Sequence, residues 1–220
     1  MVVIYNPTSS SISLDGYYLS DNKDYYEVAS DGSTPSSFGG DFLIELPDIS
    51  IGSKKEKIIS LQTADDFSTY YINQTPDLSI SDGIYYNDTG PLDSSNKLSN
   101  FAAGEMIILF KWDGSSSTVT DIDYLAWGTG SGSFVDKSSQ PGYESDTSVE
   151  SQDVIESIHE DGYTYQRKDF NEGTEISSGG NGYGGDDETS ENMSDTWEIV
   201  PFVEGCTDPK AFNFNSEAVI

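Results

Sequence analysis

Carboxylate side chains are the most abundant groups in this sequence that could do chemistry. They gather in polar loops, where hard oxygen ligands suit Ca²⁺. The candidate calcium ligands are Asp21, Asp24, Asp186 and Asp187. None of their loops has the spacing of an EF-hand, and a solvated acidic loop is the alternative interpretation.

His159 is the only histidine, which excludes zinc sites built from several histidines and leaves one candidate general base. Serine and aspartate are so frequent that a Ser–His–Asp arrangement around His159 has no distinctive spacing. The single cysteine, Cys206, lies in a different segment, which argues against a Cys–His pair. The glycine-rich stretch 179–185 is flanked by acids and lacks a following lysine, so it does not match a phosphate-binding loop. The sequence therefore predicts a non-catalytic protein with no cofactor other than calcium.

The acidity of the chain limits its partners. It has 39 acidic and 10 basic residues, and its formal net charge is −29 over 220 residues. Coulomb repulsion opposes direct binding to nucleic acid or to an anionic membrane. No apolar run reaches the roughly 18 residues of a membrane-spanning helix. Solubility in a saline setting, where counter-ions screen the self-repulsion, explains the acidity most simply.

Short apolar runs separated by turn residues must position these groups. Runs of this length between Asn, Asp, Gly and Pro predict an all-β, antiparallel β-sandwich with long polar loops. The expected extended segments are 2–5, 12–19, 42–46, 58–61, 85–86, 106–110 and 119–127.

Only two stretches have a pattern that could be helical, residues 65–72 and 148–159. Residues 177–195 combine glycine with acids and are predicted to be a flexible loop or linker with little to bury. The sandwich is therefore expected to cover residues 1–203, with a separate, incomplete unit over 204–220.

Two motifs near the beginning have a clear structural logic. I-Y-N-P-T at 4–8 is followed by L-D-G-Y-Y-L-S-D at 14–21. Asn-Pro makes a turn, Leu14 and Leu19 are expected to be buried, and Gly16 allows a bulge.

Three further motifs follow in order: A-G-E at 103–105, D-I-D-Y-L-A-W-G at 121–128 and D-G-Y-T-Y-Q-R at 161–167. With the first two, they resemble the lamin tail domain family as it occurs in bacteria. The resemblance spans about residues 2–170. This chain departs from the family pattern in a long insertion at 62–100 and in lacking the strand that usually precedes I-Y-N-P.

The resemblance implies an immunoglobulin-like sandwich without conserved catalytic machinery. It places Arg167 at the end of a strand, where it is expected to bridge a carboxylate such as Asp121. Trp127 ends another strand of the family pattern. Arg167, Asp121 and Trp127 are therefore predicted to be structural residues rather than ligand contacts.

Residues 205–218 read G-C-T-D-P-K-A-F-N-F-N-S-E-A, which resembles a repeat found in large exported proteins of marine bacteria. That repeat contains a second cysteine further on, so Cys206 is expected to be half of a disulfide; a free buried thiol is the alternative. No signal peptide is recognised at Met1, and the chain is expected to be a fragment of an extracellular or cell-surface protein.

Two functions fit these features. The first is a structural, adhesive or binding module of a secreted or cell-surface bacterial protein, with other domains of the same polypeptide, an extracellular protein or a carbohydrate as partner. The second is an accessory domain attached to an extracellular hydrolase, such as a nuclease or phosphatase. A carbohydrate-stacking face is the least specific idea. Its candidate residues are Tyr5, Tyr17, Tyr18, Tyr85, Tyr86, Tyr163 and Tyr165.

Overall fold

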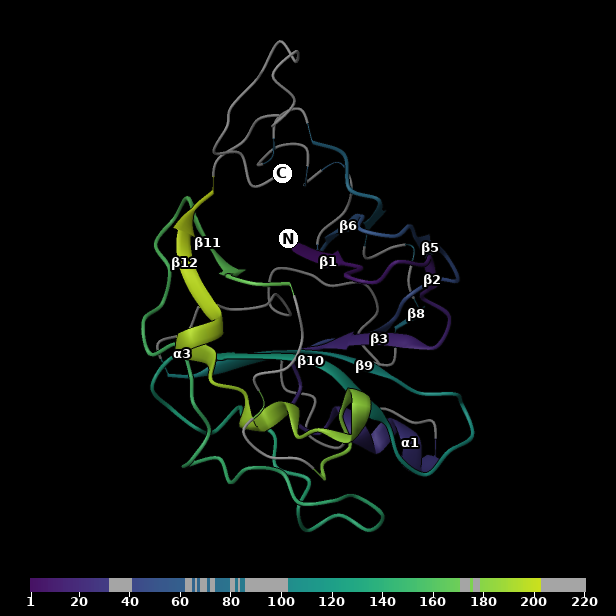
Figure 1. Ribbon diagram of the computed structural model, residues 1–220, viewed down its shortest axis with the longest axis vertical. Helices are drawn as coiled ribbons and strands as arrows, with labels where there is room; N and C mark the ends of the chain where they lie inside the picture. The colour runs from purple at the N-terminus through teal and green to yellow at the C-terminus, as the bar shows by residue number, and fades with distance from the viewer. Residues whose placement is uncertain are drawn as a thin grey trace.

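Short strands build the computed structural model, and nearly all of them pair antiparallel (Figure 1). The all-β prediction is confirmed. The structure describes residues 1–31, 41–61, 65, 67, 71, 74–79, 82, 84–85, 103–170, 175 and 179–202. The predicted unit at 204–220, with Cys206, lies outside these residues.

A five-stranded sheet is the centre of the fold. Its strands are β3 (Tyr17–Ser20), β4 (Leu43–Glu45), β8 (Ile84–Tyr85), β9 (Glu105–Lys111) and β10 (Thr120–Trp127). They lie in the order β10-β9-β3-β4-β8, and every neighbouring pair is antiparallel. The pairing of β10 with β9 shifts register between Asp121 and Asp123, so a bulge interrupts the sheet there.

The central sheet is buried on both faces, because successive side chains of a strand point to opposite sides. In β9, Met106, Ile108 and Phe110 belong to one cluster, which we call the aromatic core, whereas Leu109 packs against the other, the aliphatic core. The aromatic core also includes Tyr18, Tyr25, Tyr26, Leu43, Trp112, Tyr124, Trp127, Phe134 and Val135. The aliphatic core consists of Leu14, Leu19, Phe42, Ile44, Leu46, Ile51, Ile59, Leu61 and Leu78.

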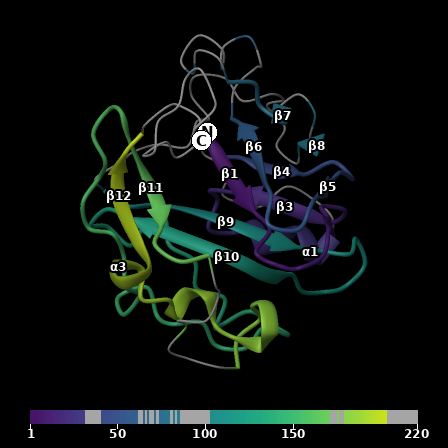
Figure 2. The same ribbon diagram turned by 45° about the horizontal axis from the view of Figure 1, so that its top comes forward.

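A second layer covers the aliphatic core. It contains a sheet of order β1-β6-β7, made of β1 (Val2–Tyr5), β6 (Glu56–Ser60) and β7 (Leu78–Ser79), and the small pair of β2 (Ile12–Ser13) with β5 (Ser50–Ile51). β1 is antiparallel to β6, and β7 runs parallel to it. Figure 2 shows β1 and β6 on one side of β9 and β10.

A two-stranded sheet and several short helices complete the described chain. β11 (Tyr163–Arg167) pairs antiparallel with β12 (Trp197–Pro201) beside β10. The helices are η1 (Tyr25–Glu27), α1 (Val28–Asp31), η3 (Tyr183–Gly185), η4 (Glu188–Ser190) and α3 (Met193–Thr196). The aromatic core is closed by these helices and by the loop after β10, which contribute Tyr25, Phe134 and Met193.

The motif at residues 4–8 forms the turn that its Asn-Pro pair predicts. The buried amide of Asn6 donates to the carbonyl oxygens of Ser10, Ile51 and Gly52, and its Oδ1 accepts from the backbone N–H of Thr8. This ties the turn after β1 to the loop before β6.

Leu14 and Leu19 are buried, as predicted. Gly16 has a φ of +71°, and a Cβ atom there would lie 2.7 Å from the carbonyl oxygen of Trp112. Only glycine fits this approach between the turn and the end of β9.

One of the two helix predictions fails, and one helical segment was not predicted. Residues 148–159 form a turn followed by extended chain, in which Ile155 bridges to Trp127 of β10. Tyr25–Asp31, where no helix was expected, forms η1 and α1. Most of the predicted helix at 65–72 lies outside the described residues.

The prediction that residues 177–195 have little to bury is wrong for the part that the structure describes. Asp187, Glu188, Thr189, Ser190 and Glu191 are all buried. The polar groups of Asp187 are used by the protein: it accepts hydrogen bonds from the N–H of Thr189 and the hydroxyl of Thr147. These internal donors offset the cost of burying this acid.

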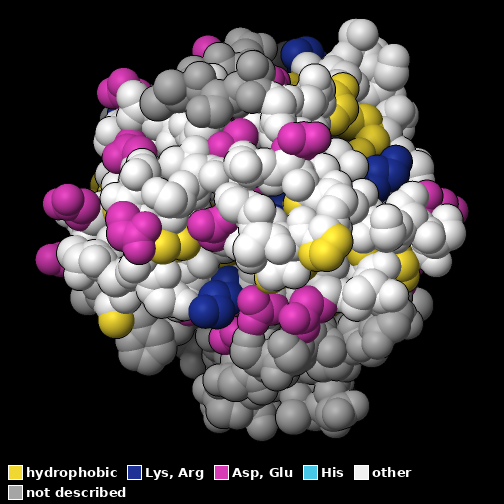
Figure 3. Space-filling model, turned by 90° about the horizontal axis from the view of Figure 1, so that it is seen from below, with side chains coloured by type: hydrophobic (Ala, Val, Ile, Leu, Met, Phe, Trp, Pro, Cys, Tyr) yellow, Lys and Arg dark blue, Asp and Glu magenta, His cyan; other side chains and the backbone are white. Residues whose placement is uncertain are grey.

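Acidic side chains are spread over the face drawn in Figure 3, with few Lys or Arg side chains among them. Among the described helices, none combines the length and the apolar character that crossing a membrane requires.

Candidate binding groove

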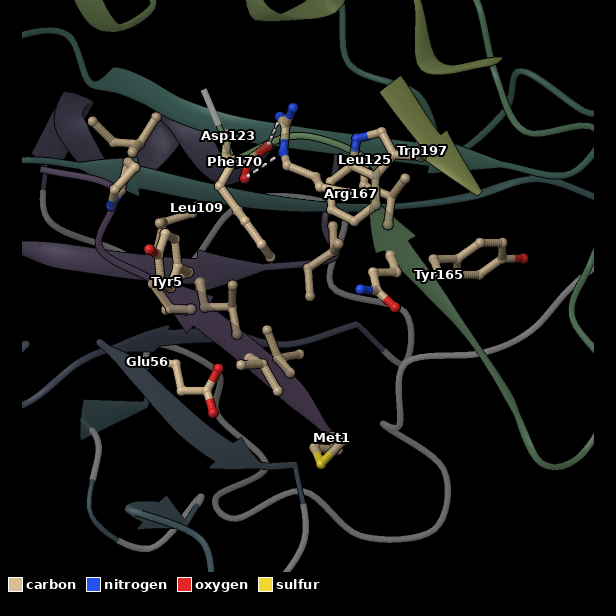
Figure 4. Close-up of a pocket in the computed structure, with 18 of the residues that line it drawn as sticks. Met1, Tyr5, Glu56, Leu109, Asp123, Leu125, Tyr165, Arg167, Phe170 and Trp197 are labelled. Atoms are coloured by element: carbon tan, nitrogen blue, oxygen red, sulfur yellow. Dashed lines mark hydrogen bonds and ion pairs between the residues drawn. The ribbon is translucent and has the colours of Figure 1, made fainter. Parts of the chain in front are cut away.

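An apolar groove of about 520 Å³ lies between β1 and β11 (Figure 4). Leu109 of β9 and Leu125 of β10 line it, so the central sheet forms its floor. Consecutive residues of the two strands, 2–5 in β1 and 164–167 in β11, form its walls. We call this feature the β1–β11 groove.

Each wall of the groove is a sheet edge. In the described part of the chain, β1 has one hydrogen-bonded neighbour, β6, and β11 has one, β12. The second layer is thus divided into β12-β11 on one side of the groove and β1-β6-β7 on the other. A strand edge presents backbone N–H and C=O groups that another strand can pair with.

The rim of the groove exposes large apolar side chains. Among the described residues, the exposed large hydrophobic side chains are Val3, Ile158, Tyr163, Phe170 and Tyr183. Three of these five line the groove: Val3, Phe170 and Tyr183, with exposed fractions of 38%, 48% and 62%. The ring of Phe170 lies 4.5 Å from that of Tyr5, between centroids. Such a concentration of exposed apolar surface is typical of a binding site.

Arg167 holds the β11 wall in place. Its guanidinium donates two hydrogen bonds to the carboxylate of Glu191, at 2.7 and 3.1 Å, and pairs with Asp123 of β10. It also lies over the ring of Trp197, 4.8 Å from the centroid. Burial raises the pKa of Glu191, although the Arg167 charge opposes this shift. The arginine thus joins the β11-β12 pair to the central sheet.

Arg167 does bridge carboxylates, but the prediction of Asp121 as its partner is wrong. Asp121 accepts a hydrogen bond from Lys137 at 2.7 Å, inside the aromatic core. Trp127 is 2% exposed, also in the aromatic core, and its ring lies 5.1 Å from that of Tyr165. Lys137 was not singled out from the sequence, because one lysine among polar loop residues has no distinguishing neighbour in the chain.

The candidate calcium ligands are used largely by the protein itself. Asp21 is buried and accepts from the N–H of Phe42 at 2.6 Å, and burial raises its pKa well above the usual range. Asp187 accepts from Thr147 and Thr189. In the ranges that the structure describes, no three His, Cys, Asp or Glu side chains are arranged to hold a metal ion, and Asp24 and Asp186 belong to no such group.

His159 lies in the loop before β11. Its Nδ1 is 3.0 Å from the carbonyl oxygen of Glu160, and its ring packs edge-on against Tyr165, with the centroids 5.0 Å apart. Neither contact is to a hydroxyl or a carboxylate that would complete a catalytic triad.

The candidate stacking tyrosines do not share one surface. Tyr18 is buried in the aromatic core, whereas Tyr163 is exposed and Tyr5 lines the groove. Tyr86 and the side chain of Tyr85 lie outside the described residues.

Comparisons with known protein families, with curated protein sequences and with solved structures give no match to this chain.

Proposed function

We propose that this chain is a non-catalytic, immunoglobulin-like sandwich, related to lamin tail domains, of a secreted or cell-surface protein, and that it binds an extended polypeptide segment in the β1–β11 groove. The same groove would serve an accessory domain beside an extracellular hydrolase.

The observation that carries this proposal is the pair of strand edges on either side of an apolar floor. An extended segment lying between β1 and β11 would gain backbone hydrogen bonds on both sides, as in β-strand addition. Its inward side chains would cover Leu109 and Leu125, and outward ones would remain in water.

The groove also limits the chemistry of its ligand. β1 has four residues and β11 five, so a segment of about five residues, roughly 17 Å long, would span the walls. Alternating apolar and polar residues fit a floor on one side only. Because the net charge is −29, we expect Lys or Arg, rather than acids, to flank the apolar positions.

A fluorescently labelled peptide of alternating Val and Thr, flanked by Lys, tests this proposal by fluorescence anisotropy. We expect binding in the micromolar range, and loss of binding when Pro replaces the central residue, since Pro removes a backbone donor. Amide signals of β1 and β11 should shift together in NMR spectra of the complex.

Two surface variants provide a matched comparison. Phe170→Ala removes an exposed apolar side chain at the rim, and Ile158→Ala removes one of similar exposure, 40%, that does not line the groove. We expect Phe170→Ala to weaken binding at least several-fold and Ile158→Ala to leave it unchanged. Equal losses, or equal affinity for the Pro-containing peptide, would show general stickiness and refute strand addition.

A further inference from the structure

Lys137 lies completely buried between two buried carboxyl groups. Its Nζ is 2.7 Å from Oδ2 of Asp121 and 2.9 Å from Oδ2 of Asp146, and all three side chains are at most 4% exposed. The β10 bulge supplies Asp121, and the loop between β10 and β11 supplies the other two residues. An amine is thus held against two carboxyl groups with almost no access for water.

Tyr25 completes this arrangement. Its hydroxyl donates to Oδ1 of Asp121 at 2.5 Å, and its ring centroid lies 5.7 Å from Nζ of Lys137. The ring of Tyr143 lies on Nζ at a similar distance, 5.9 Å. The two oxygens of Asp121 therefore have different partners, a hydroxyl on Oδ1 and the amine on Oδ2.

We propose that Lys137 and Asp121 become joined by an amide bond inside the folded chain, with Asp146 moving the protons. An amine and a carboxylic acid condense to an amide and water once both are neutral. Burial removes the solvation that stabilises both charges in bulk water, which lowers the cost of passing through the neutral pair. The short distances fix the orientation of the two groups, which water does not do.

The steps balance in atoms and charge. The Lys137 ammonium gives one proton to Oδ2 of Asp121, which leaves an amine beside a carboxylic acid. Nζ attacks Cγ of Asp121, the negative charge develops on Oδ1 against the Tyr25 hydroxyl, and the Asp146 carboxylate takes a proton from the nitrogen. Asp146 then returns this proton to Oδ2, which leaves as water as the C=O bond re-forms. The site begins and ends with one negative charge.

The electrostatics agree with the part assigned to Asp146. Burial raises the pKa of Asp146, against the opposing charge of Lys137, which makes it a better proton acceptor. Burial by itself would lower the pKa of Lys137, but Asp121 and Asp146 outweigh it and raise the pKa. The first proton transfer is therefore uphill, and we expect a bond that forms over hours rather than seconds.

Intact-mass spectrometry of the refolded chain tests this proposal directly. Samples taken over several days should show a product lighter by one water, about 18 Da. Trypsin should no longer cut after Lys137, and fragment spectra of residues 112–167 should place the link between residues 121 and 137. The chain held in urea should keep its full mass, because only the fold aligns the groups. Full mass in the folded chain after that time would overturn the proposal.

Variants separate the link from other losses of water. Lys137→Arg keeps a cation but has no amine nucleophile, so it should keep its full mass; Lys111→Arg, a change on the surface, should lose water like the wild type. Asp146→Asn should form the bond about a hundredfold more slowly. Water lost equally by Lys137→Arg would indicate a succinimide at an Asp-Gly pair and overturn the proposal, as would a link mapped to residue 146. If Lys137→Arg fails to fold, the time course and mapping of the wild type decide alone.

Discussion

At the scale of single residues, Arg167 shows how one cation stabilises an acidic chain. Glu191, which it binds through two hydrogen bonds, has a fully buried side chain. Arg167→Ala would leave this carboxylate buried without its charge partner, so we expect the free energy of unfolding to fall by about 3–5 kcal/mol. Urea unfolding followed by circular dichroism measures this change.

Lys57→Ala is the matched control for Arg167→Ala. Lys57 also pairs with an acid, Asp77, but both side chains are partly exposed, 27% and 32%. This pair should contribute less than about 1 kcal/mol. Equal effects of the two variants would contradict the importance that we assign to burial of Glu191.

Glu105, buried at the start of β9, makes stability depend on pH. Burial raises its pKa to about 7, the N–H of Met106 opposes the shift, and the charge of Asp41 adds to it. Since the folded state binds the proton more tightly than the unfolded chain, stability should rise as the pH falls from 8 to 5. The share of Glu105 is about 2–3 kcal/mol.

Glu105→Gln should flatten this pH dependence, and Glu150→Gln, in an exposed loop, should keep the slope of the wild type. Melting temperatures between pH 5 and 8 provide the comparison. A wild-type slope in Glu105→Gln would assign the effect to another buried acid, such as Asp21.

The role of His159 can be tested without knowledge of a substrate. We expect nuclease, phosphatase, esterase and glycosidase assays of this chain to show no activity, because the contacts of His159 described above include no nucleophile and no carboxylate. Any activity that His159→Ala abolishes would refute a non-catalytic role.

The sequence predicted Arg167 as a structural cation but not its partners. Asp121 and Asp123 are two residues apart in one strand, and a regular strand would point both to the same face. The bulge between them separates their roles. Asp121 meets Lys137 in the aromatic core, and Asp123 lines the groove with Arg167. The residue types around Asp121 and Asp123 do not predict that bulge.

At the scale of elements, a single acid stabilises the segment between η3 and α3. Asp187 accepts from the N–H and hydroxyl of Thr189 at the start of η4, and from the hydroxyl of Thr147. Asp187→Ala should lower the free energy of unfolding by about 1–2 kcal/mol. Asp186→Ala, a change to its less buried neighbour, should lie within about 0.5 kcal/mol of the wild type. A larger loss of stability in Asp186→Ala than in Asp187→Ala would show that η4 does not depend on this cap.

Elements whose side chains alone decide their conformation were predictable. The apolar run 106–110 supplies both faces of a buried strand, and it forms β9. Residues 148–159 have apolar spacing that suits a helix, but tertiary hydrogen bonds override it. The amide of Gln152 donates to the carbonyl oxygens of Val135 and Thr147, and Ile155 pairs with Trp127. Val135 and Trp127 lie too far along the chain from this segment for a local pattern to include them.

At the scale of the whole molecule, a net charge of −29 destabilises the fold through self-repulsion. We expect sodium chloride to raise the melting temperature by screening. Calcium at equal ionic strength should do no better, because Asp21 and Asp187 already accept hydrogen bonds from the protein. A melting temperature in calcium well above that in sodium chloride would instead support a calcium site. Asp21, Asp24, Asp186 and Asp187 would then be the first positions to mutate.

The two cores on opposite faces of the central sheet differ in their tryptophan content, and therefore in whether intrinsic fluorescence reports on them. The chain has three tryptophans; Trp112 and Trp127 belong to the aromatic core, and Trp197 packs against it while lining the groove. None belongs to the aliphatic core. Intrinsic tryptophan emission is therefore a one-sided reporter. Detachment of the β1-β6-β7 layer would leave the emission of Trp112 and Trp127 unchanged, whereas a peptide entering the groove would alter the emission of Trp197, which lines it.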